Sequence, residues 1–278
     1  MKYYYINFFR VIIISFLLFS CKDSKDEPQI HYKLKTIKSS LLHYEELDNN
    51  SYFYVPYSNI VWDKDFNSTI ALQYNEQNQV ISTNYGSSIY PKGTNQNNVA
   101  FSKTNIDKIQ FNGDVINTEN CFPYSSYTDT IKYIIKDGKL LERIVFIGYF
   151  NQELDYSYHY ANDKIIETMN GLQTSVFYLT NSNITKIEKF QYNISKEIVS
   201  KTEFIYSDYD QSINLLKGYY YIHGAFYNAF STNNYKKQFV NTYSYSNYQY
   251  TQISTSSLSI NYNIDSNNIP DLFEYEKY

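Results

Sequence analysis

Cysteine and histidine, which often bind metals or take part in catalysis, are scarce in this chain. It has two cysteines and four histidines among 278 residues. His31, His43, His159 and His223 show none of the spacings that are typical of metal ligands, and Cys121 has no partner at such a spacing. The sequence contains neither a glycine-rich phosphate-binding loop nor a nucleophile elbow. We therefore predict no catalytic, cofactor-binding or metal-binding residue.

An excess of positive charge is also missing. The 24 lysines and arginines are outnumbered by 28 acidic residues, so the formal net charge is −4, and no basic cluster stands out along the chain. Long-range attraction to nucleic acid or to an anionic membrane surface is not expected from such a chain.

The single apolar run near the start, Val11–Phe19, is too short to span a bilayer, since a spanning helix needs about 20 residues. Lys2 and Arg10 precede the run, and a small residue follows it directly before Cys21. This order is typical of a secretory signal, and a cysteine at the boundary is typical of bacterial lipoproteins. We predict a signal peptide over residues 1–20 and lipidation of Cys21. The alternative is an ordinary secretory signal with Cys21 as a core residue.

Residues 21–35 read as a flexible tether, because Lys22–Pro28 is charged and has no apolar side chain. Two or more acyl chains hold a protein stably on a membrane, so the lipid bilayer is a predicted partner through acylated Cys21. Lys25-Asp26-Glu27 resembles the acidic export signals of Bacteroidetes surface lipoproteins. That resemblance implies an outer-membrane lipoprotein on the cell surface. A merely solvated spacer, with the protein on the periplasmic face, explains the same residues.

The body of the chain, residues 36–278, has the length of a single β domain. If Cys21 is lipidated, no intramolecular disulfide can form, so the domain must depend on its core. We predict that Cys121 is a small buried hydrophobic residue.

Tyrosine is far more frequent than phenylalanine, with 34 residues against 18. An AT-rich genome would raise both equally, because their codons are equally AT-rich, so the excess has a cause in the protein. Tyrosine favours strands and tolerates a wet sheet face. The structural interpretation is therefore a sheet with exposed, tyrosine-covered faces. The functional one is a platform that stacks on sugar rings or aromatic ligands.

Alternation with a period of two runs through most of the body and predicts a chain of hairpins. The clearest covers residues 131–146 around Asp137-Gly138, a strong two-residue turn. Its expected register pairs Lys136 with Lys139, Ile135 with Leu140 and Ile134 with Leu141. Further hairpins are expected over residues 70–83, 154–167, 175–190 and 258–275. The second of these pairs Tyr160 with Ile165 and His159 with Ile166, and His159 is expected to be packed.

These degenerate repeats predict an all-β fold, a long antiparallel meander of hairpins forming a curled open sheet or part-closed barrel with little helix. Two stretches interrupt the pattern. Residues 86–98 read as a loop. Residues 207–234 lack clean alternation and predict one short helix or a packed irregular loop.

The hairpin units resemble those of the YD-repeat-like, tyrosine-rich lipoproteins of Bacteroidetes, a family of unknown function. The similar segments are Gln73–Val80, Tyr158–Ile165, Phe230–Asn234 and Tyr262–Asp265. Most turns here lack the glycine expected of the family. The resemblance implies an all-β, surface-attached protein and no established activity.

A few acidic and aromatic residues have both a functional and a structural interpretation. The carboxylate pairs that could serve a glycosidase, each equally a solvated turn or strand face, are Glu45-Glu46, Asp63 with Asp65, and Glu274 with Glu276. Asp208-Tyr209-Asp210 lacks the further ligands of a calcium loop. Trp62 follows two aliphatic residues, which favours a core position over a sugar platform.

Three functions remain open at this level. The first is a non-enzymatic binding or structural scaffold at the cell envelope, with a glycan or an envelope protein as its partner. The second is a glycan-binding module for polysaccharide capture, which needs a row of exposed tyrosines on a concave face. The third is a carboxylate-based glycoside hydrolase, which needs two acidic side chains facing each other in a pocket.

Overall fold

The computed structural model describes residues 32–38, 62–64, 69–85, 89–91, 106–121, 129–147, 151–222 and 225–277. The chain divides into two compact units, Met1–Tyr32 with Lys277–Tyr278, and Lys33–Glu276. Apart from the terminal residues Tyr32 and Lys277, every strand lies in the second unit. Within the described ranges, no helix has the length and hydropathy that crossing a membrane requires.

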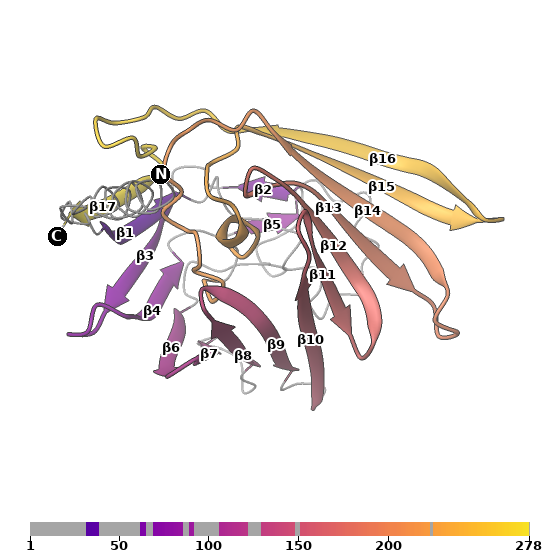
Figure 1. Ribbon diagram of the computed structural model, residues 1–278, viewed down its shortest axis with the longest axis horizontal. Coiled ribbons are helices and arrows are strands. Elements are labelled where there is room, and N and C mark those ends of the chain that lie inside the picture. Colours follow the sequence, from indigo (N-terminus) through magenta and orange to yellow (C-terminus); the bar gives the residue numbers. More distant parts are fainter. Residues whose placement is uncertain are drawn as a thin grey trace, which may run out of the picture. The chain divides into compact units, whose positions relative to one another are not determined.

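Fifteen strands form one antiparallel sheet (Figure 1). They are β1 (Tyr32–Lys38), β3 (Thr69–Tyr74), β4 (Val80–Tyr85), β6 (Ile106–Asn112), β7 (Val115–Cys121), β8 (Asp129–Lys136), β9 (Lys139–Ile147), β10 (Gln152–Tyr160), β11 (Lys164–Met169), β12 (Leu172–Thr180), β13 (Asn183–Tyr192), β14 (Ile198–Ser207), β15 (Lys237–Ser246), β16 (Gln249–Ser259) and β17 (Phe273–Lys277). From β6 to β16 each strand pairs with the next one in the chain. The sheet ends at β16 on one side and at β17 on the other, so it is open, as the sequence predicts.

Several turns explain why the chain folds back so regularly. Asp137-Gly138, Asn181-Ser182 and Asn247-Tyr248 each join two strands through two residues with positive φ. Such type I′ turns match the right-handed twist of the flanking strands. Asparagine and aspartate tolerate this region better than most residues with a Cβ. The meander is therefore encoded locally, in the turn residues.

The registers of the predicted hairpins are confirmed near the turns and altered further away. Lys136 pairs with Lys139 and Ile135 with Leu140, as expected, and both predicted pairs of the β10–β11 hairpin are present. Ile134, however, lies opposite Glu142 and not Leu141, because a bulge follows it. A bulge adds a residue to one strand and changes every pair beyond it.

Three expectations from the sequence differ from the structure. The hairpin over residues 258–275 is confirmed only around its turn, where the Asp265 amide donates to the Ile269 carbonyl and Ile264 bridges Pro270. Its arms do not pair further, because β17 joins the far edge beside β1. The loop over residues 86–98 includes a strand, β5 (Ile89–Pro91), which pairs with β2 (Trp62–Lys64). Regular structure already begins at Tyr32, inside the segment read as the tether.

The central segment is the name used here for residues 208–222 and 225–236, which lie in the chain between β14 and β15. They lie within the curve of the sheet (Figure 1). Their one short helix in the described part is η3 (Tyr227–Phe230), a 3-10 helix whose residues are all buried. Tyr221 packs against Phe111 of β6, and Tyr227 packs against Phe204 of β14. Strands lie about 4.8 Å apart, so β6 and β14 would be about 38 Å apart in a flat sheet. One segment reaches both because the sheet curls around it.

Candidate functional site

The inner face of the sheet, which faces the central segment, is filled by aromatic side chains. Phe230 lies 5.1 Å from Phe177 of β12, 6.3 Å from Tyr158 of β10 and 4.8 Å from Tyr220, measured between ring centroids. Phe226 lies 6.2 Å from Tyr158. Such pairs contribute about 0.5–1.5 kcal/mol each beyond the area that they bury. The central segment is therefore packed into the sheet as part of the core.

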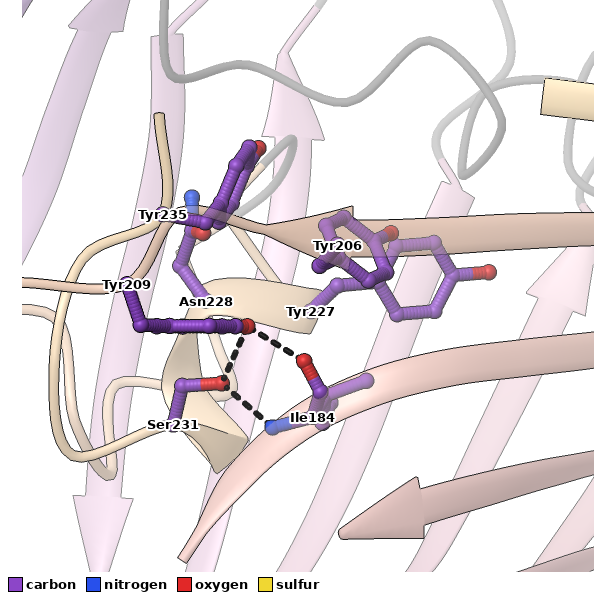
Figure 2. A pocket seen from close by; sticks show the side chains of 7 residues that line it. All are labelled: Ile184, Tyr206, Tyr209, Tyr227, Asn228, Ser231 and Tyr235. Atoms are coloured by element: carbon purple, nitrogen blue, oxygen red, sulfur yellow. Dashed lines mark hydrogen bonds between the residues drawn. The ribbon is translucent and has the colours of Figure 1, made fainter. Parts of the chain in front are cut away.

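A narrow crevice marks the border between the central segment and β13 (Figure 2). Its lining residues are Ile184, Tyr206, Tyr209, Tyr227, Asn228, Ser231 and Tyr235. Its empty volume is about 140 Å³, in spaces too narrow to hold a water molecule. The Tyr209 hydroxyl donates to the Ile184 carbonyl, and the Ile184 amide donates to Ser231 Oγ at 3.0 Å. These bonds join the central segment to β13 at the crevice, and no carboxylate lines it.

A buried ion pair lies beneath the central segment. Arg143 of β9 and Glu167 of β11 approach to 3.6 Å, with side chains 7% and 4% exposed. The guanidinium carbon lies 4.6 Å from the ring centroids of both Tyr156 and Phe226. Arg143 thus joins a ring of β10 to a ring of the central segment, an arrangement that contributes about 2 kcal/mol where water is excluded.

Glu167 is held by hydroxyl groups as well as by Arg143. Tyr158 donates to one carboxylate oxygen at 2.7 Å, and Thr174 and Ser175 each donate to the other at 2.9 Å. Burial raises the pKa of Tyr158 well above its usual value, and the bond to Glu167 adds to the rise. Burial disfavours the charge on Arg143, but Tyr158 and Glu167 outweigh it and raise the pKa of Arg143. Both carboxylate oxygens of Glu167 accept hydrogen bonds from neighbouring side chains. The ion pair and its hydroxyl partners therefore stabilise the fold.

Asparagine side chains attach the central segment to the sheet. Asn183, at the start of β13, accepts the backbone amides of Thr232 and Asn233 at 2.9 and 2.8 Å. Asn214 donates to the carbonyls of Asn228 and Ser231, both at 2.8 Å. These bonds satisfy backbone groups that no strand partner reaches. The irregular path of the segment is therefore specified by side chains.

The outer face of β12–β16 carries a network of alternating charges. The Lys201 ammonium contacts Glu188 at 3.2 Å and Glu203 at 2.7 Å, and Lys186 contacts Glu188 at 3.2 Å. Tyr178 donates to Glu188 at 2.7 Å, and Tyr243 donates to Glu203 at 2.9 Å. Two lysines and two glutamates balance in this network, which crosses β12, β13, β14 and β15.

The contacts within this network lower the pKa of Glu188 and raise the pKa of Tyr178, so they favour an ionised glutamate beside a protonated tyrosine. Although partial burial opposes it, hydrogen bonds from Tyr178, Lys186 and Lys201 lower the pKa of Glu188. Burial and the bond to Glu188 raise the pKa of Tyr178 to about 12. Lys201 also lies 4.7 Å from the ring centroid of Tyr250 and 5.2 Å from that of Tyr243. A face of each ring is therefore already occupied.

The tyrosines of the inner face and of the central segment are packed and do not form an exposed row. Eight of them in the described ranges are at most 9% exposed: Tyr133, Tyr156, Tyr158, Tyr206, Tyr220, Tyr221, Tyr227 and Tyr235. The structural interpretation of the tyrosine excess is wrong for these residues, because it placed the rings on exposed sheet faces and they are buried. A concave platform for glycans has no support in them, because stacking on a sugar needs an exposed ring face.

The candidate residues named from the sequence are dispersed. Glu274 and Glu276 are exposed on β17, where Glu274 accepts a bond from Thr36 and Glu276 contacts Lys35 at 3.4 Å. They lie outside any described pocket. His159 pairs with Ile166 as predicted but is exposed, so the expectation of a packed histidine is wrong.

Asp208 and Asp210, of the stretch compared above with a calcium loop, contact Lys237 and Lys236 at 2.7 and 3.4 Å. No group of His, Cys, Asp and Glu in the described ranges is arranged to hold a metal ion. Predictions for Cys21, His31, His43, Glu45-Glu46, Asp65 and His223 lie outside the described residues, as do those for the side chains of Trp62, Asp63 and Cys121.

Sequence reasoning missed Arg143 and Glu167. A signal for each exists in the alternation: Arg143 shares its strand side with Val145, and Glu167 shares its side with Ile165, and all four are buried. A charged residue at a core position of a strand needs a buried partner, because an unpaired charge is costly away from water. Which partner it has depends on the pairing of β9, β10 and β11.

Comparison with known proteins finds distant structural similarity and no matching family. No family model matches the chain, and no curated protein matches it. Among solved structures it is similar to a porin-like protein from Bacteroides vulgatus, with a TM-score of 0.44 and 12% identity over 75% of this chain and 90% of that one. It is also similar to a porin-like protein from Bacteroides uniformis, with a TM-score of 0.40 and 11% identity over 76% of this chain and 86% of that one.

Proposed function

We propose that this protein is a lipid-anchored scaffold of the bacterial envelope, without enzymatic activity, that binds through its open sheet. The observation that carries the proposal is the packing of the central segment. Phe226 and Phe230 occupy the inner face, where a curled sheet would otherwise enclose a ligand. The outer face and the edges of the sheet are the surfaces left for a partner.

The attachment rests on Cys21 and the residues around it. A short apolar run ends in Ser20-Cys21, and a charged stretch follows before β1 begins at Tyr32. Acyl chains on Cys21 would hold the protein at the outer membrane. Lys25-Asp26-Glu27 would direct it to the cell surface.

Metabolic labelling with a clickable fatty acid tests the anchor. We expect the wild type and a Cys121→Ala control to carry the label and to sediment with membranes, and Cys21→Ala to lose both properties. Replacement of Lys25-Asp26-Glu27 by alanines should protect the protein from protease added to whole cells. Unlabelled wild-type protein would contradict the anchor.

Incubation of the purified full chain with mixed glycans and peptides tests the absence of catalysis. We expect every substrate to be recovered intact. Turnover by the wild type that persists through a second, independent purification would overturn the scaffold. The labelling experiment would be unaffected, so the two parts of the proposal can fail separately.

A further inference from the structure

The two edges of the fifteen-stranded sheet differ in length and chemistry. β17 at one edge has five residues, Phe273–Lys277, and β16 at the other has eleven, Gln249–Ser259. An edge strand presents a row of backbone N–H and C=O groups that has no partner within its own sheet. Proteins normally protect such edges with charge, proline, shortness or a covering element.

β17 carries these protective features and β16 has few of them. Glu274, Glu276 and Lys277 are charged and exposed on the short β17. β16 contains no charged residue, no proline and no glycine, although 19% of the whole chain is charged. Its one protective feature is a bulge near Ile253, where the register with β15 shifts.

Among the described residues, no strand or helix packs over either face of β16. Nine of its eleven residues are exposed and the other two are intermediate. Since neighbouring side chains alternate between the two faces of a sheet, this pattern means that both faces are open to solvent. Ile253 is 55% exposed, Tyr250 is 39% exposed, and Phe239 on the adjoining β15 is also 39% exposed. An uncharged, accessible edge of this length is a template for another strand.

We propose that β16 pairs edge to edge with β16 of a second copy of this chain, antiparallel about a two-fold axis. Self-pairing brings together two identical strands, and because β16 is uncharged no like charges meet across the axis. The same pairing at β17 would oppose the glutamates of two copies. An isologous contact also occupies the β16 edge of both copies, and because the β17 edge is protected the assembly stops at a dimer. The inference stands on the fold and does not require the lipid anchor.

Sedimentation equilibrium of the purified full chain in density-matched detergent tests the pairing. We expect a reversible dimer in the micromolar range. Thr255→Lys combined with Ser257→Lys should weaken dimerisation at least tenfold, because four ammonium groups would then meet at one edge. The matched control is Asn241→Lys combined with Phe239→Lys, at the residues paired with these on β15. The control places the same charges on the same face one strand further in, and it should dimerise within about twofold of the wild type.

Hydrogen exchange of the wild type locates the contact without any substitution. Amides of β16 should gain protection as the protein concentration rises, while those of β17 should not. A wild type that stays monomeric, or a dimer equally strong in the β16 variant, would overturn the proposal. Protection of β16 in a monomer would overturn it too, because the edge would then be closed within the chain or by a different partner.

Discussion

Arg143 and Glu167 carry opposite charges in the packed interior beneath the central segment. Each charge would be costly there alone, since the penalty for removing an ion from water is several kcal/mol. The pair is kept by three hydroxyl donors to Glu167 and by two rings around Arg143. Such a pair specifies which strands and which part of the central segment meet, and its contribution depends on both partners being present.

Arg143→Met should therefore lower the free energy of unfolding by about 3–5 kcal/mol, because Glu167 would remain buried without its partner. The double variant Arg143→Met/Glu167→Gln should recover part of this loss. Urea unfolding followed by circular dichroism measures both.

The matched control is the surface pair of Lys237 and Asp208, which is shorter at 2.7 Å but about half exposed. Lys237→Met should change stability by less than about 1 kcal/mol. Equal losses in the buried and the surface variant would contradict a special role for Arg143.

At the scale of elements, the two-residue turns set where the chain reverses. Asn247-Tyr248 has φ values of 50° and 61°, although a bulky side chain at positive φ is strained. Tyr248 is 93% exposed, so its ring gains little packing in return. At Asp137-Gly138 the glycine has φ 71°, and a Cβ there would meet no atom within 4 Å. The cost of a side chain at Gly138 is therefore a backbone cost alone.

Tyr248→Gly should stabilise the β15–β16 hairpin by about 1 kcal/mol, because glycine adopts this conformation without strain. Gly138→Ala should destabilise the β8–β9 hairpin by a similar amount. Hydrogen exchange of the amides in each hairpin measures the local effect. Faster exchange in β15 and β16 of Tyr248→Gly would show instead that the ring stabilises the turn.

At the scale of the whole molecule, the tyrosines make stability depend on alkaline pH. Burial raises the pKa of Tyr158, Tyr209 and Tyr221 above the ordinary value of 10.0. These groups are neutral in the folded state and ionise more readily when the chain unfolds. The stability that they contribute is therefore complete below pH 10 and is lost as the pH rises above it.

The free energy of unfolding should thus fall steeply above pH 10, and ultraviolet absorbance of phenolate should rise together with unfolding. Tyr221→Phe removes one of the buried hydroxyls and should reduce the steepness. Phenolate absorbance that is complete at an ordinary tyrosine pKa, while the fold persists, would show that these rings are accessible.

The parts of the fold that can be predicted from the sequence are those that depend on residues close together in the chain. Asp137-Gly138 marks a two-residue turn, and the pairs of Lys136 with Lys139 and of Ile135 with Leu140 follow from the turn geometry. The pairing of Ile134 with Glu142 was not predictable, because a bulge moves the register without a local signal. The ion pair of Arg143 and Glu167 could not be predicted for a similar reason. Their contact depends on the pairing of three strands, β9, β10 and β11.

The sequence by itself determined an all-β meander of hairpins, whereas the lipidation of Cys21 stays a prediction. These features follow from residues within one turn or one strand of each other. Only the tertiary structure decided that many tyrosines are packed inside, that β17 crosses to the edge beside β1, and that the central segment packs into the curve of the sheet. The reason is physical: these features are contacts between distant segments, and their free energy exists only once the sheet has curled.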